Sequence, residues 1–157
     1  MKLRMVALVR LSAAISLFAA GGVHLQQYIV ADYRVIPTIG PLFLLNFVGA
    51  TLLGLYFLIP ADRQAGRVRL IIDAVAALAG WFLAAGALVA LLVSEHTPLF
   101  GFMEHGHRFA IVFAIVSEAV AIVALTILIV DNRVTSRRKR GPHHGSTMAM
   151  SATDPTT

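Results

Sequence analysis

The chain has 157 residues, of which 58% are hydrophobic and 13% are charged, with a formal net charge of +5. Soluble domains carry about 25% charged residues, so this composition excludes an ordinary soluble domain and is typical of a protein that crosses a membrane several times. Cysteine is absent, which excludes disulfides, thiolate metal sites and cysteine redox chemistry.

Four long apolar segments follow one another along the chain. Each has about the 20 residues that a helix needs to cross a bilayer, and they cover residues 5–23, 39–59, 70–93 and 109–130. A helix satisfies its own backbone hydrogen bonds inside the hydrocarbon core. The sequence therefore predicts an all-α fold, a four-helix transmembrane bundle with short loops over residues 1–132. A disordered basic tail is predicted over residues 133–157.

The first segment allows two interpretations. Residues 1–22 have a basic start, an apolar stretch and small residues at the end, as a cleaved secretory signal peptide has. Arg10 interrupts the segment, but an arginine side chain can extend to the membrane surface and leave the segment able to span. We favour a first span, because no clear cleavage site precedes a polar mature N-terminus.

Basic residues predict the orientation of the spans. Eleven of the 13 lie near the termini or in the loop between the second and third spans, and the other two loops hold only Arg34 and Arg108. The positive-inside rule therefore places both termini in the cytoplasm, with the chain in a bacterial plasma membrane. One cluster in the tail is a candidate site for anionic lipid headgroups, although we favour the interpretation that it is only an orientation signal. It consists of Arg137, Arg138, Lys139 and Arg140.

The third segment contains an acid near its start and small residues further on. Asp73 lies four residues after Arg69. Because acids stabilise helix N-termini, we interpret Asp73 as a helix start signal. Gly86 has no side chain and would let a neighbouring helix approach closely.

The few polar side chains inside the spans fall at a similar depth. Glu118 is the tenth residue of the apolar run 109–130, roughly 13 Å from its outer end. Asn46 lies about 10 Å down the second span, and Ser16 lies at a similar depth in the first. Buried polar groups in lipid bond to one another. We therefore predict that Glu118 faces the bundle interior and hydrogen-bonds to Asn46, with Ser16 or Ser117 nearby and no basic residue at that depth.

A carboxyl group at mid-membrane needs an explanation, because charged groups there cost roughly 2.5–3.5 kcal/mol on insertion scales. In one interpretation Glu118 only stabilises the bundle, through interhelical hydrogen bonds worth about 0.6–2 kcal/mol. In the other it takes up and releases a proton to drive transport of a small solute. Four spans offer little room for a central pathway, so such a carrier is expected to be a dimer.

Histidines and acids gather near the predicted outer face. The candidate metal ligands are His24, His96, Glu104, His105 and His107. Imidazole and carboxylate groups bind zinc, copper or nickel, and histidines on facing helices bind haem. A metal site needs three or four convergent ligands, which spacing alone does not provide, so we expect no bound cofactor.

Several short motifs resemble those of known membrane proteins. They are the stretch from His24 to Asn46, Phe100-Gly101-Phe102 with Glu104, and Ser117-Glu118-Ala119. Over residues 15–130 the chain resembles a group of small four-span membrane proteins of actinobacteria, and more loosely the DoxX-like membrane proteins, some of which are linked to respiratory redox systems. The resemblance implies the topology and no chemistry. Small multidrug transporters also have four spans and a membrane glutamate, but theirs lies in the first helix, which argues against membership.

The sequence therefore predicts a small multi-pass membrane protein with a structural or accessory role. We expect no enzyme, because the sequence shows no nucleophile–base pair or catalytic motif. The alternatives are a dimeric proton-coupled carrier that acts through Glu118, and an outer-face binder of a metal or redox cofactor. The expected partners are the lipid bilayer and either a second copy of the chain or a larger membrane complex, with no nucleic acid.

Overall fold

Four long helices make up most of what the computed structural model describes, which is residues 3–60, 66–94, 96–97 and 108–138. They are α1 (Leu3–Val30), α2 (Ile39–Leu58), α3 (Arg67–Ser94) and α4 (Arg108–Arg138), with a short 3-10 turn, η1 (Tyr33–Val35), between α1 and α2. All four helices are long and apolar enough to cross a membrane. The predicted all-α, four-helix membrane fold is confirmed.

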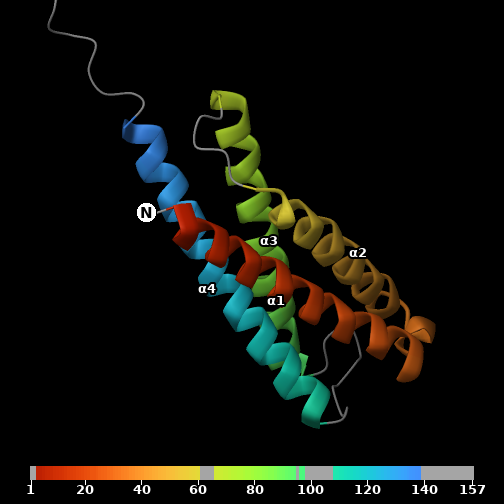
Figure 1. The fold of residues 1–157 in the computed structure, drawn as a ribbon. Coiled ribbons are helices and arrows are strands. Elements are labelled where there is room, and N and C mark those ends of the chain that lie inside the picture. Colours follow the sequence, from red (N-terminus) through yellow and green to blue (C-terminus); the bar gives the residue numbers. More distant parts are fainter. Residues whose placement is uncertain (1–2, 61–65, 95, 98–107, 139–157) are drawn as a thin grey trace, which may run out of the picture.

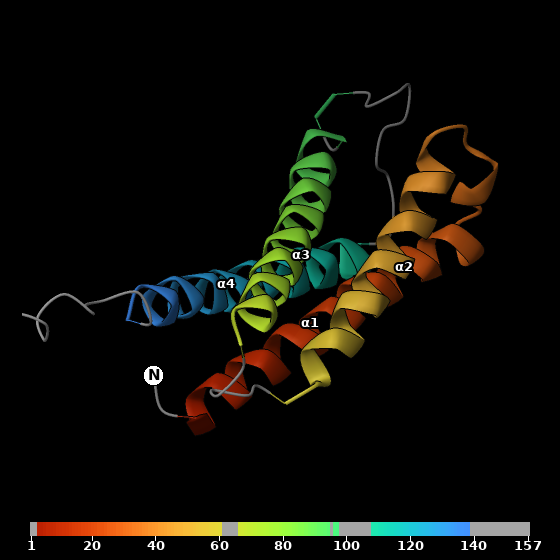
Figure 2. The same ribbon diagram turned by 90° about the horizontal axis from the view of Figure 1, so that it is seen from above.

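Helix α1 is the central helix of the bundle. Successive helices run in opposite directions (Figure 1), and α1 packs along both α2 and α4. Helix α3 crosses over α4 (Figure 2) and touches α2 only sparsely, while α2 and α4 do not pack against each other in the part of the chain described. The side of the bundle between α2 and α3 is therefore less closely packed than the sides that α1 joins.

Small residues allow α1 to pack closely against its neighbours. Ala13 on α1 and Ala121 on α4 are fully buried, and Leu17 fills the space beside them. A Cβ atom added at Gly21 would lie only 3.1 Å from the Cβ of Ala50 on α2, which is tighter than ordinary contact. Lipid tails are as apolar as these side chains, so close van der Waals packing is what holds such helices together.

Two helices extend beyond their predicted ends. The apolar pattern ends α1 at Val23, but the helix continues to Val30 and includes His24 and Gln27. A helix of 28 residues is about 42 Å long, more than the roughly 30 Å of the hydrocarbon core, so its last turns can hold polar side chains. Helix α4 continues to Arg138, so residues 133–138 are helical and were wrongly predicted to be disordered. The rest of the predicted tail lies outside the described residues.

Candidate functional site

A cavity of about 300 Å³ opens between α2 and α3, in the half of the bundle that contains the α1–α2 connection. Its walls are largely apolar and include Phe43 on α2 and Leu83 and Ala87 on α3. Leu45 and Phe82 also line it and are 63% and 66% exposed, so the cavity opens on the outer surface of the bundle, which faces lipid. Pockets for small molecules begin at about this volume.

Four polar side chains lie in the wall of this cavity, and one of them, Ser94 on α3, donates its hydroxyl to the Leu91 carbonyl at 2.8 Å. His24 and Gln27 come from α1, where residues three apart share one side of the helix, and Asn46 comes from α2. The ring of Phe43 meets the His24 ring edge-on, with 4.9 Å between centroids, and this contact fixes the plane of the imidazole. His24 is the one titratable residue among the described residues that line the cavity.

His24 also makes the interhelical bond that buries Glu118. Its Nε2 lies 3.1 Å from Oε1 of Glu118 on α4, whose side chain is 1% exposed. With one proton on the pair, the Nε2–H donates to the carboxylate and Nδ1 is a hydrogen-bond acceptor. With a second proton on either partner, Nδ1 carries a hydrogen and becomes a donor. The imidazole therefore connects the cavity wall to a carboxyl group one layer behind it.

The predicted bond between Glu118 and Asn46 is wrong, and so is the prediction that no basic residue lies at that depth. Helix α1 lies between α2 and α4, so Asn46 is kept from Glu118 and faces the cavity instead. Ser16 is buried on α1, and Ser117 is buried on α4, where its hydroxyl donates to the Ala114 carbonyl at 3.0 Å. Counting residues along a span gave depth, but it could not give the direction in which each side chain points.

Several polar atoms around the pair are buried and have no hydrogen-bond partner within the described chain. They are Nδ1 of His24, Oε1 of Gln27 and Oε2 of Glu118. Leaving such a group unsatisfied costs about 1–3 kcal/mol. Two of these three residues line the cavity, so its wall has unused hydrogen-bonding capacity for the polar group of a bound molecule.

The candidate metal ligands are not gathered into one site by the residues that the structure describes. No group of three or more His, Cys, Asp or Glu residues there could hold a metal ion. His24 pairs with Glu118, and Nδ1 of His96 donates to the Leu92 carbonyl at 2.9 Å, beyond the end of α3. The remaining candidates, Glu104, His105 and His107, lie outside the described residues.

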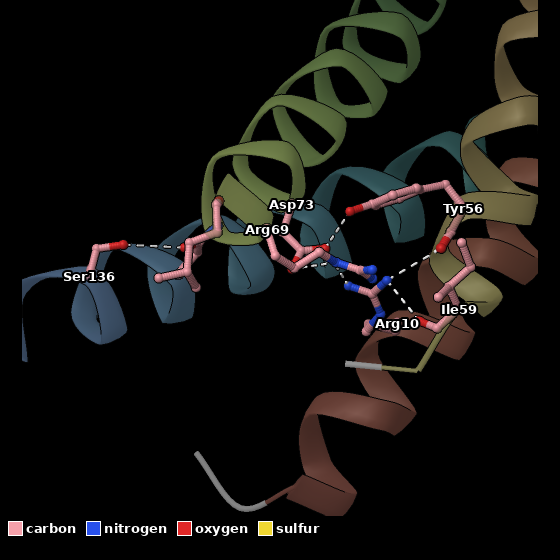
Figure 3. Close-up of polar contacts among 8 residues, drawn as sticks. Arg10, Tyr56, Ile59, Arg69, Asp73 and Ser136 are labelled. Carbon is pink, nitrogen blue, oxygen red and sulfur yellow. Dashed lines mark hydrogen bonds and ion pairs between the residues drawn. The ribbon is translucent and has the colours of Figure 1, made fainter. Parts of the chain in front are cut away.

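A second buried polar cluster, absent from the sequence predictions, lies at the opposite end of the bundle (Figure 3). Arg10 on α1 is 5% exposed; its Nη1 donates to Oδ1 of Asp73 at 3.2 Å. Its Nη2 donates to the carbonyls of Tyr56 at 3.3 Å and Ile59 at 2.9 Å, at the end of α2. The Tyr56 hydroxyl donates to Asp73 at 2.6 Å, and Nε of Arg69 lies 3.5 Å from the other Asp73 oxygen. The cluster ties α1, α2 and α3 together.

This cluster corrects two predictions. Arg10 was expected to extend to the membrane surface, but its guanidinium is held inside the bundle. Asp73 was interpreted as a helix start signal, but α3 already begins at Arg67, and Asp73 forms an ion pair with Arg10. The sequence contained one signal for this pair. A basic residue and an acidic residue each interrupt an apolar span, and each lies near the end of its span that antiparallel packing brings close to the other.

The candidate headgroup cluster is only partly described. Arg137 is exposed on the last turn of α4, and Arg138 is the last residue of that helix. Lys139 and Arg140 lie outside the described residues. The structure therefore leaves the lipid-binding role of this cluster as a prediction.

No protein family model, curated protein or solved structure matches this chain. The resemblance to actinobacterial four-span and DoxX-like membrane proteins thus stays a prediction from the motifs.

Proposed function

We propose that this four-helix membrane protein is a non-enzymatic binding protein for a small lipophilic molecule, which enters the cavity from the bilayer. We further propose that the His24–Glu118 pair links this binding to the uptake or release of a proton. The observation that carries the proposal is the apolar cavity of about 300 Å³, open toward lipid, with His24 in its wall.

The chemistry of the wall defines the class of molecule. Apolar side chains such as Phe43 and Leu83 suit an aromatic or aliphatic body. His24 and Gln27 each keep a buried polar atom without a partner, so the ligand should carry a hydroxyl or carbonyl group. Because the volume is small, a compact ring system fits better than a whole phospholipid.

The arrangement of the imidazole supports the link to a proton. Nδ1 of His24 accepts a hydrogen bond when the pair holds one proton and donates when the pair holds two. A carbonyl ligand, which only accepts, should therefore favour the doubly protonated pair. By linkage, binding of such a ligand raises the affinity of the pair for the proton to the same extent. This coupling is what the carrier alternative requires of Glu118.

Filling the cavity should remove binding. A Cβ atom added at Gly86 on α3 would meet nothing within 4 Å, and Gly86 lines the cavity, so Gly86→Phe places a ring in the space without a clash at its base. Gly22→Phe is the matched control, because Gly22 on α1 is also unobstructed but lies outside the cavity wall.

The probe is a trifluoromethyl phenyldiazirine that carries a benzylic hydroxyl, applied to the protein in phosphatidylcholine nanodiscs and located by peptide mass spectrometry. We expect saturable labelling of Leu83, Ala87 and Phe43 in the wild type and in Gly22→Phe. In Gly86→Phe we expect labelling to fall by about tenfold, because the probe loses one hydrogen bond and its apolar contacts. Labelling that does not saturate, or that Gly86→Phe leaves unchanged, would overturn the proposal.

We also propose that both termini face the cytoplasm in a bacterial plasma membrane, on the distribution of basic residues. The chain has no cysteine, so a single introduced cysteine can show which side of the membrane a loop faces without labelling of any native thiol. In intact cells, a membrane-impermeant maleimide should label Thr97→Cys in the α3–α4 connection. It should label Gly66→Cys, before α3, only after the membrane is permeabilised. The reverse pattern would contradict this orientation.

A further inference from the structure

The groove between the start of α1 and the end of α2 contains two arginines among apolar residues. Its volume is about 400 Å³, and Arg4 and Arg10 lie in its wall with Ala7, Leu11, Leu58 and Ile59. Leu11, Leu58 and Ile59 are 46%, 50% and 45% exposed, so the groove is open on the surface that faces lipid. It lies at the other end of the bundle from the cavity between α2 and α3.

Positive charge is in excess at this groove. In the part of the chain that the structure describes, Asp73 is the one carboxylate paired with Arg10, and it also faces Arg69. Arg4 makes no ion pair with any described residue, so among the described residues the guanidinium groups of Arg4, Arg10 and Arg69 have only the Asp73 carboxylate between them. A charge excess beside a hydrocarbon phase is unfavourable unless an anion balances it.

The guanidinium of Arg10 also keeps hydrogen-bonding capacity. Its Nη atoms already donate to Asp73 and to two carbonyls of α2, but its Nε is buried and has no partner. Arg10 lines the groove and is 5% exposed, so this donor is not solvated at the surface. A buried donor without a partner costs free energy that an acceptor would recover.

We propose that this groove binds the phosphate of an anionic phospholipid of the phosphatidylglycerol type. Arginine is the side chain best suited to phosphate, because its N–H groups match the phosphate oxygens in pairs. Arg4 and Nε of Arg10 provide the donors, and Leu11 and Leu58 provide apolar surface for an acyl chain. A zwitterionic lipid would bring its own cation to a site that already has an excess of positive charge, so an anionic lipid is selected.

Native mass spectrometry of the whole chain in detergent tests this site, with phosphatidylglycerol and phosphatidylcholine of identical acyl chains as probes. The wild type should bind one phosphatidylglycerol at least about fivefold more tightly than phosphatidylcholine. Arg4→Gln should weaken phosphatidylglycerol binding by about five- to tenfold. Arg4 is exposed and makes no ion pair among the described residues, so the fold should survive its loss, which circular dichroism checks.

Two further variants separate the groove from general surface charge. Ala7→Trp should block the site sterically and weaken phosphatidylglycerol binding without changing net charge. Arg137→Gln removes an exposed positive charge at the same end, from the cluster predicted to bind headgroups, and should have no effect on this site. Equal weakening by Arg137→Gln and Arg4→Gln, or competition by free inorganic phosphate at similar concentration to the lipid, would overturn the proposal.

Discussion

Replacing Asp73 with leucine is expected to lower the free energy of unfolding by roughly 3–5 kcal/mol, the cost of leaving one charge of a buried pair without its partner. Arg10 would keep its bonds to the Tyr56 and Ile59 carbonyls but would lose its counter-ion. The Tyr56 hydroxyl would lose its acceptor at 2.6 Å. Because the Asp73 side chain is 20% exposed and water can reach it, we expect a value toward the lower end of this range.

Reversible unfolding in mixed micelles measures this effect, and the chain offers a matched control. The Arg34–Asp32 pair has a similar separation, 3.1 Å, but its side chains are 56% and 66% exposed. Asp32→Asn should therefore cost no more than about 1 kcal/mol, whereas Asp73→Leu costs several times as much. Asparagine also tolerates the left-handed backbone at Asp32, where φ is 56°.

A double-mutant cycle identifies the ion pair as the cause. If the charges stabilise each other, Arg10→Leu combined with Asp73→Leu should be less destabilised than the sum of the two single variants, because no unpaired charge remains. Additive losses would show that Arg10 acts mainly by capping the carbonyls at the end of α2, independently of Asp73.

The sequence was sufficient to predict the helices and their membrane character, because both depend only on the length of the apolar segments. Ile39 begins both the predicted second span and α2, and the predicted ends of α3 lie within three residues of the observed ones. The end of α1 was missed because hydropathy marks His24 as the first polar residue after an apolar run. Hydropathy does not reveal that the helix continues and turns this side chain inward.

Side-chain partners were not predictable, because they depend on which helices are neighbours. Asn46 and Glu118 lie at comparable depth, but α1 separates their helices, and this order cannot be read from spacing. Gly86 shows the same limit. Glycine permits a close helix approach without requiring one, and at this position the space is open and forms part of the cavity.

Glu118→Gln is expected to preserve the fold and to remove the link between ligand binding and the proton. Glutamine has the same shape and can still bond to Nε2 of His24, so the free energy of unfolding should change by less than about 1 kcal/mol. Glu118→Leu cannot form this bond and should lose up to about 2 kcal/mol. The two variants thus separate the hydrogen bond from the ionisable group.

Photolabelling with benzophenone measures whether ligand binding is still linked to the proton, because benzophenone is photoreactive and its carbonyl only accepts hydrogen bonds. In the wild type, its labelling of the cavity should become about tenfold more efficient once a second proton on the pair turns Nδ1 of His24 into a donor, and labelling across a series of pH values tests this. In Glu118→Gln, a second proton on the ring would have no counter-charge, and the pH dependence should disappear. No other titratable side chain lies among the described residues of the cavity wall.

Asn46→Leu completes the comparison between a stabilising and a functional role for Glu118. Asn46 lines the cavity and does not bond to Glu118, so its loss should leave stability nearly unchanged and preserve the pH dependence of labelling. If Glu118 only stabilised the bundle, Glu118→Leu would reduce stability, while labelling at each pH would be equal in the wild type and Glu118→Gln. A pH dependence that requires the carboxyl group, in variants of equal stability, can arise only if the proton on this pair is coupled to the occupant of the cavity.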